Sequence, residues 1–250
     1  MALFDAHLHI IDPRFPLIAN DGYLPPAFTV ADYRTRTVGL GITGGAVVSG
    51  SFQAFDQAYL IAALTELGPG FVGVTNLPPE AGEAEIARLD AAGVRAARFN
   101  LKRGGSQGAD AIERVARRVH DLAGWHVELY ADAAELSDHA AMLAALPRVA
   151  IDHLGLSQAG LPVLLRLVEA GVHVKATGFG RVELDTAGAM RAISAVNPGA
   201  LMFGTDLPST RAKRPFAESD IDLVRETLGE DLAARALHTN AAAFYRLAPS

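Results

Sequence analysis

Short runs rich in apolar and β-branched residues recur along this 250-residue chain, and their spacing limits the fold more than any other feature. Successive runs begin about 20 to 30 residues apart, the interval expected when a helix crosses over between parallel strands. The runs are Leu3–His9, Gly45–Ser49, Phe71–Thr75, Val94–Leu101, His126–Ala131, Val149–His153, Val172–Thr177 and Leu201–Thr205. They predict an α/β fold built on a parallel sheet.

The segments between these runs have the composition and periodicity of helices. Clear examples are Ala84–Ala92, Ala109–Ala123, Ala133–Leu146 and Leu161–Ala170. Gly93 and Gly171 follow two of them, at the position where glycine commonly ends a helix. Strands and helices in this alternation predict a (β/α)8 TIM barrel that forms a single domain over residues 1–250. An open, doubly wound sheet is the alternative, although no Gly-x-Gly-x-x-Gly sequence follows a strand.

Composition narrows the classes of function. The net charge is −6, which argues against nucleic acid as a partner. The chain has no cysteine, so thiolate metal sites and a cysteine nucleophile are excluded. Its apolar stretches are shorter than the roughly 20 residues of a membrane helix. Because Met1 runs straight into the first predicted strand, we expect no signal peptide. We therefore expect a cytoplasmic protein with no membrane partner, either a monomer or a homodimer.

The first connection between strand and helix is unusually long. Ile10–Thr29 is rich in proline and glycine and is expected to be an irregular loop. In a barrel this loop lies at the C-terminal face, where such loops cover substrates. Tyr23 within it is a candidate for a hydrogen bond to substrate, or for packing of the loop itself.

Two histidines near the N-terminus are the first candidates for chemistry. His7 and His9 lie two residues apart on the first strand, so their side chains are expected on the same face, at the mouth of the barrel. Two imidazoles in this position can bind a metal or donate hydrogen bonds to a polarised oxygen.

Polar residues also end the sixth and eighth strands. Asp152 and His153 are adjacent at the end of the sixth, so we expect His153 to point inward and Asp152 to be structural. Asp206 follows the eighth strand and is a candidate catalytic carboxylate. The alternative for Asp206 is that it caps the next helix.

Cations follow the fourth, seventh and eighth strands. They are Arg98 and Arg103, then Arg181, then Arg211. Guanidinium groups at a barrel mouth can bind carboxylates through two parallel hydrogen bonds, so together they predict an anionic substrate. On the fifth strand, Tyr130 is a further candidate for contact with substrate. Glu128, buried on the same face, would need a partner or a metal and is a reserve metal ligand.

The ordered set of motifs resembles the amidohydrolase superfamily, in particular its lactonase branch, which includes 2-pyrone-4,6-dicarboxylate lactonase. The matching segments are Asp5-Ala-His7-Leu-His9, Tyr23-Leu-Pro-Pro, Arg98-Phe-Asn100, Asp152-His153-Leu-Gly155, Gly204-Thr205-Asp206-Leu-Pro208 and the closing Asn240-Ala-Ala-Ala-Phe-Tyr-Arg-Leu. The resemblance spans nearly the whole chain.

The resemblance implies hydrolysis of a small anionic lactone, from a dicarboxylate or a sugar acid, without a required cofactor. His7, His9 and His153 would polarise the lactone carbonyl. Asp206 would take the proton from the attacking water and return it to the leaving oxygen. The arginines on the fourth and seventh strands, Arg98, Arg103 and Arg181, would hold substrate carboxylates with help from Tyr130.

Four alternatives remain open. One divalent metal, Zn or Mn, could be held by His7, His9 and Asp206, with Glu128 or His153 as a further ligand. This scheme needs a histidine near the end of the fifth strand, but Tyr130 stands there and His126 is expected to lie too deep. A decarboxylase and a lactone isomerase fit the same scaffold. A non-enzymatic barrel that binds an acidic metabolite would be expected to lack part of this set.

Overall fold

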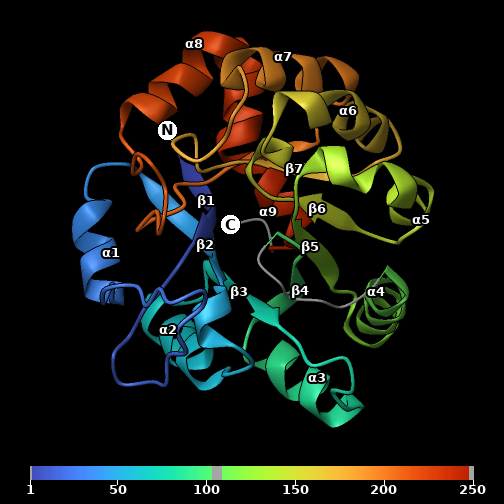
Figure 1. The fold of residues 1–250 in the computed structure, drawn as a ribbon. Coiled ribbons are helices and arrows are strands. Elements are labelled where there is room, and N and C mark those ends of the chain that lie inside the picture. The colour runs from blue at the N-terminus through green and yellow to red at the C-terminus, as the bar shows by residue number, and fades with distance from the viewer. Residues whose placement is uncertain (1, 103–108, 248–250) are drawn as a thin grey trace.

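The chain folds into a barrel of eight parallel strands surrounded by helices (Figure 1). The computed structural model describes residues 2–102 and 109–247. The strands are β1 (Leu3–Leu8), β2 (Ile42–Val48), β3 (Phe71–Asn76), β4 (Val94–Asn100), β5 (His126–Tyr130), β6 (Val149–Ile151), β7 (His173–Ala176) and β8 (Leu201–Phe203). They pair in sequence order, each parallel to the next.

Hydrogen bonds between the segment that follows β8 and the end of β1 close the sheet into a barrel. The Asp206 backbone amide donates to the His7 carbonyl (2.7 Å), and the His9 amide donates to the Leu207 carbonyl (2.8 Å). The Asp5 carboxylate adds a side-chain link, since it accepts from the backbone amide and the hydroxyl of Thr205 (2.8 and 2.7 Å). These contacts confirm the prediction of a (β/α)8 barrel over the open sheet.

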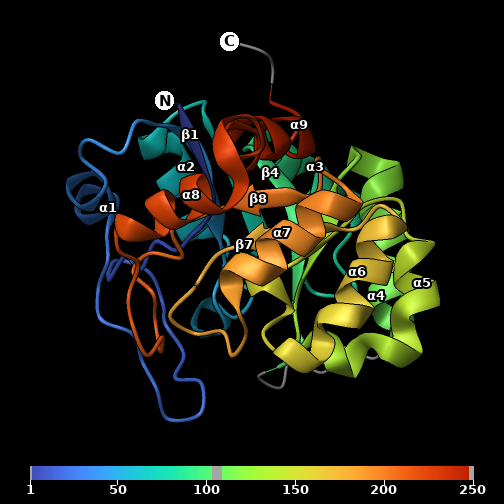
Figure 2. The ribbon, with the colours of Figure 1, turned by 90° about the horizontal axis from the view of Figure 1, so that it is seen from above.

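The helices cover the outside of the barrel (Figures 1 and 2). They are α1 (Val30–Arg36), α2 (Ala58–Leu67), α3 (Glu83–Ala91), α4 (Ala109–Ala123), α5 (Ala140–Ala144), α6 (Leu161–Glu169), α7 (Thr186–Val196), α8 (Ser219–Ala234) and α9 (Asn240–Phe244). The prediction of one helix over Ala133–Leu146 was wrong. A 3-10 helix runs over Ala133–His139 before α5 begins, and Ser137 and Asp138 within it are poor residues for an α-helix interior.

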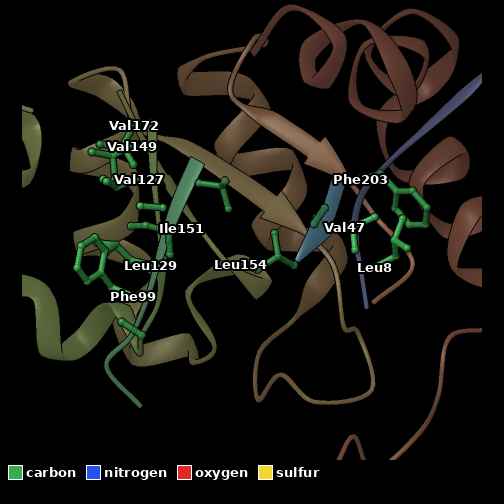
Figure 3. Packing of buried hydrophobic residues seen from close by; sticks show 14 of the residues in the cluster. Leu8, Val47, Phe99, Val127, Leu129, Val149, Ile151, Leu154, Val172 and Phe203 are labelled. Atoms are coloured by element: carbon green, nitrogen blue, oxygen red, sulfur yellow. The ribbon is translucent and has the colours of Figure 1, made fainter. Parts of the chain in front are cut away.

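Two apolar layers hold the barrel together. The outer layer lies between strands and helices, with side chains such as Leu8, Val127 and Ile151 pointing away from the barrel axis (Figure 3). The inner layer consists of side chains from the strands packed against Phe244 and Tyr245 at the end of the chain. The interior of the barrel is therefore filled by side chains, and α9 closes the end of the barrel that lies opposite the long loops (Figure 2).

The two ends of the barrel differ. Figure 2 shows α9 on one side, and the long loops after β1 and β8 on the other. The loop after β1 lies against the 3-10 turn that follows β2, because the Ile18 amide donates to the Phe52 carbonyl (2.8 Å). None of the helices in residues 2–102 and 109–247 is long and apolar enough to cross a membrane.

Candidate active site

An open pocket of about 410 Å³ lies at the carboxyl ends of the strands, beneath the long loops. It is lined by His9, Tyr23, Gly50, Ser51, Phe52, Arg98, Asn100, Tyr130, His153, Arg181, Thr210 and Arg211. His7 and Asp206 are fully buried and adjoin these lining residues. The structure thus brings together nearly all the side chains selected from the sequence. Arg103 lies outside the described residues.

The three predicted histidines form a cluster. The ring of His7 lies 5.0 Å from that of His9 and 4.8 Å from that of His153, measured between centroids. His9 Nδ1 lies 2.7 Å from the carbonyl oxygen of Val48, which can only accept, so Nδ1 carries the proton. In its neutral form His9 therefore presents a lone pair at Nε2, which lies 3.6 Å from Asp206 Oδ1.

The two ring nitrogens of His7 have different surroundings. Its Nδ1 lies 3.5 Å from Lys175 Nζ and 3.4 Å from Asp152 Oδ1. Its Nε2 lies 3.8 Å from Asp206 Oδ1 and has no hydrogen-bond partner within the described ranges. Burial lowers the pKa of His7 to about 4, despite the opposing attraction of Asp152. The ring is therefore neutral at physiological pH.

The prediction that Asp152 faces away from His153 was wrong. It assumed an extended strand, but β6 ends at Ile151 and His153 adopts a left-handed backbone with φ 52°. Asp152 is fully buried beside His7. His153 Nδ1 lies 2.7 Å from Thr177 Oγ1, and burial lowers the pKa of His153 well below its usual range. Both residues therefore belong to the site.

Asp206 is held as an ionised carboxylate with one free oxygen. Burial would raise the pKa of Asp206, but the positive charge of Arg181 and the proximity of His153 hold it far below its usual range. Oδ2 accepts from Arg181 Nε (2.9 Å) and Nη2. Oδ1 has no hydrogen-bond partner among the described residues and is buried between His7 and His9. Asp206 also has a left-handed backbone, with φ 58°.

Arg98 and Arg181 make ion pairs within the protein that the sequence did not predict. Arg98 donates from Nε and Nη2 to Asp152 Oδ2 (3.2 and 2.9 Å) and from Nη1 to the Ser49 carbonyl (3.0 Å). Arg181 likewise donates from Nε and Nη2 to Asp206 Oδ2. Both forks therefore bind carboxylates of the protein. Each guanidinium has five N–H groups, so contact with a substrate carboxylate through the remaining N–H groups stays a prediction.

Arg211 and Tyr23 join the two long loops above the pocket. The Arg211 guanidinium lies over the Tyr23 ring, 4.5 Å from its centroid. Arg211 Nη2 also donates to the Asn20 carbonyl, and Nη1 lies 3.8 Å from Asp21 Oδ2. Tyr130 lies deeper, with its ring edge-on to His153 at 5.3 Å and Arg98 over its face at 5.5 Å. All three candidates, Arg211, Tyr23 and Tyr130, line the pocket as expected.

Glu128 is not placed as a metal ligand, which corrects the expectation from the sequence. Its Oε2 lies 2.5 Å from Lys175 Nζ, and Oε1 accepts from Tyr245 Oη (2.5 Å) and lies 3.0 Å from His126 Nε2. His126 lies deep in the barrel against Phe244 and Tyr245, as predicted.

Sequence reasoning missed Lys175 as a site residue. The available signal was a lysine inside a run expected to be a buried strand, since a buried lysine needs a buried acid.

The donor atoms fit one divalent metal ion geometrically. Two groups offer ligand atoms within 4.8 Å of one another: His7, His9 and Asp206, and His7, Asp152 and His153. In the first, His9 has the hydrogen bond to a backbone carbonyl that is typical of a metal-bound histidine. His7 Nε2 and Asp206 Oδ1 are buried and lack partners in the part of the chain that is described. His7 can join this set only when its proton is on Nδ1.

Comparison with known proteins identifies relatives over the whole chain. The family model described as Amidohydrolase matches residues 4–247. The chain is 28% identical to D-galactarolactone isomerase of Agrobacterium fabrum, over 98% of this chain and 91% of that protein. It is 30% identical to a 2-pyrone-4,6-dicarboxylate hydrolase of Comamonas testosteroni over 156 residues, which are 60% of this chain and 51% of that protein.

A solved apo structure from Agrobacterium tumefaciens superposes on this fold with a TM-score of 0.86 and 26% identity, covering 99% of this chain and 97% of the other. The family match, the barrel and the histidine–aspartate site at its C-terminal face agree. The chain therefore belongs to the amidohydrolase family.

Proposed function

We propose that the chain opens the lactone ring of a small carboxylated acid by adding water to the ring carbonyl. The observation that carries the proposal is the convergence of His7 Nε2, His9 Nε2 and Asp206 Oδ1. These atoms gather beside a pocket lined with arginines. Relatives named for a lactone isomerase and a pyrone dicarboxylate hydrolase support a cyclic ester as the substrate class.

Asp206 and His9 handle the attacking water in this scheme. Asp206 Oδ1 and His9 Nε2 both accept hydrogen bonds, so one water molecule donating to both would direct its two lone pairs away from them, toward the pocket. Asp206 takes the proton as the water attacks, then returns it to the ring oxygen as the acyl–oxygen bond breaks. This changes the role inferred from the resemblance, in which His9 donates to the carbonyl.

His7 and His153 stabilise the negative charge on the carbonyl oxygen. A neutral His7 with its proton on Nε2 is a donor directed toward the Asp206 side of the site. His153 is a donor at Nε2 when Thr177 Oγ1 donates to its Nδ1. Prearranged donors of this kind typically contribute about a hundredfold or more in rate. A divalent ion held by His7, His9 and Asp206 would polarise the same carbonyl and lower the pKa of bound water.

Lactone isomerisation is the second candidate, and the end-to-end match to D-galactarolactone isomerase favours it. The same residues serve if a hydroxyl of the substrate replaces water as the nucleophile. Asp206 then deprotonates that hydroxyl, and the carbonyl donors are unchanged.

Product analysis in ¹⁸O-labelled water separates the two reactions. A panel of acidic lactones, five- and six-membered, with one or two carboxylates, is incubated with the protein and the products are followed by NMR and mass spectrometry. Hydrolysis gives the open acid with one ¹⁸O atom in the new carboxylate. Isomerisation gives a ring of the other size without label. Failure to convert any lactone in the panel would contradict both candidates.

A further inference from the structure

Lys175 is the one fully buried lysine among the described residues, and its charge is balanced by a buried acid, Glu128. Its ammonium lies 2.5 Å from Glu128 Oε2, 3.5 Å from His7 Nδ1 and 3.8 Å from Asp152 Oδ1. Replacing a buried ion pair by apolar side chains is often neutral or stabilising. The ion pair with Glu128 holds the Lys175 ammonium, a group that can only donate hydrogen bonds, beside the ring of His7.

The two neighbours of His7 Nδ1 make opposite demands. Lys175 can only donate, so a hydrogen bond from it requires a lone pair on Nδ1 and puts the proton on Nε2. Asp152 can only accept, so a bond to it requires the proton on Nδ1 and leaves a lone pair on Nε2. The first arrangement makes His7 a donor in the site, whereas the second makes it a metal ligand.

The surroundings of Nε2 favour the donor form. His9 already presents a lone pair there, and Asp206 presents a carboxylate oxygen 3.8 Å from His7 Nε2. A lone pair on His7 Nε2 would bring three acceptors together with no proton between them. A proton on Nε2 instead faces Asp206 Oδ1, which has no other partner in the described part of the chain. On the other side of the ring, Asp152 Oδ2 accepts from Arg98, while its Oδ1 lies 3.4 Å from His7 Nδ1 and has no hydrogen-bond partner in the described part of the chain. Of the two groups beside Nδ1, Lys175 is the one that makes the hydrogen bond.

We propose that Lys175 is a positioning residue that holds His7 with its proton on Nε2 and so makes the site a hydrogen-bonding centre rather than a metal centre. Glu128 holds Lys175 in place, and Tyr245 of the C-terminal segment holds Glu128. This inference deepens the proposed lactone chemistry, because it assigns the donor that the carbonyl oxygen needs.

The test reads the His7 tautomer directly by long-range ¹H–¹⁵N NMR on protein labelled at histidine, with His7 assigned through His7→Gln. Lys175→Met alone leaves Glu128 buried without its cation, so the informative variant is Lys175→Met with Glu128→Gln. Tyr245→Phe is the matched control, because it disturbs the same cluster and keeps Lys175.

We expect the Nε2–H form of His7 in the wild type and in Tyr245→Phe, and the Nδ1–H form in the double variant. The double variant should also bind zinc at least tenfold more tightly by calorimetry. On a lactone substrate its metal-free kcat should fall about a hundredfold with KM nearly unchanged. An Nδ1–H wild type, or an Nε2–H double variant, would overturn the assignment. If the wild type converts no lactone, the proposed reaction is overturned, while the NMR result on the His7 tautomer still stands.

Discussion

At the scale of single residues, the proposed reaction depends on one free carboxylate oxygen. Asp206 binds Arg181 through Oδ2, and its Oδ1 remains directed at His7 and His9. The ion pair keeps the carboxylate ionised, and the left-handed backbone at φ 58° sets its direction. Strained backbone of this kind is common at functional sites because the surrounding structure must enforce it.

Asp206→Asn should therefore remove the proton-transfer step while keeping the shape of the site. We expect kcat on the best lactone to fall about a thousandfold, with a circular dichroism spectrum like that of the wild type. The kinetic constants are measured with the substrate identified by the ¹⁸O experiment. Activity within tenfold of the wild type would remove Asp206 from the base role.

Arg98 makes a different prediction, because its partner is a buried carboxylate. Arg98→Met leaves Asp152 buried without its guanidinium, which should destabilise the fold by about 3 kcal/mol. Adding Asp152→Asn should restore most of that loss, since an amide needs no counter-charge. Urea denaturation of the two single variants and the double variant measures the coupling. Additive effects would show that the pair is unimportant for stability.

At the scale of elements, the C-terminal segment packs against the end of the barrel that lies opposite the pocket (Figure 2). Tyr245 packs against Phe4 of β1, with ring centroids 5.5 Å apart, and donates to Glu128 of β5. Residues at opposite ends of the chain thereby share one core. The inner apolar layer therefore consists of side chains from the strands together with those of α9 and Tyr245.

Tyr245→Phe should destabilise the protein by about 1–2 kcal/mol, because it keeps the ring and removes a buried hydrogen bond to a charged group. Urea denaturation measures the change in the free energy of unfolding. Tyr23→Phe, in the long loop after β1, is the comparison variant. A change below about 0.5 kcal/mol would mean that the hydroxyl contributes little.

The elements were predictable to different degrees. All eight strands were found, because buried parallel strands are continuous apolar runs that end in turn residues. The ends of strands were less predictable. β6 stops two residues before His153, so the alternation rule failed at the residues where chemistry begins.

The partners of the arginines were not predictable at all. Arg98 and Asp152 are separated by 54 positions in the sequence and meet only when the barrel closes. The candidate histidines and Asp206 were found because strand ends meet at one face. Their tautomers and ion pairs depend on contacts across the barrel that no local pattern carries.

At the scale of the whole molecule, burial of ionisable groups makes stability depend on pH. Burial lowers the pKa values of His7 and His126 to about 4, so the folded state resists taking up these protons. Their contribution is complete above pH 6.5 and is lost as the pH falls toward 4. Burial also raises the pKa of Asp5 to about 6, which acts in the opposite direction.

Burial lowers the pKa values of His153 and His173 as well, so four histidines oppose Asp5, the carboxyl whose pKa is raised. The free energy of unfolding should therefore fall between pH 7 and pH 4. His7 and His126 are each worth about 3 kcal/mol over their full range and Asp5 offsets a similar amount, so the net loss is at least on the order of 3 kcal/mol. Urea denaturation at pH 7, 5.5 and 4.5 measures it. In Asp5→Asn the compensating gain is absent, so the loss should be steeper. Constant stability across this range would contradict neutral buried histidines.

In the proposed reaction, histidine hydrogen bonds and Asp206 open a lactone without a required metal. The most direct measurement is turnover of an acidic lactone by protein that has been exhaustively chelated and checked for residual metal. We predict that kcat/KM stays within a factor of two of the untreated protein and that added zinc or manganese does not raise it. Activity that disappears on chelation and returns with either metal would contradict the claim.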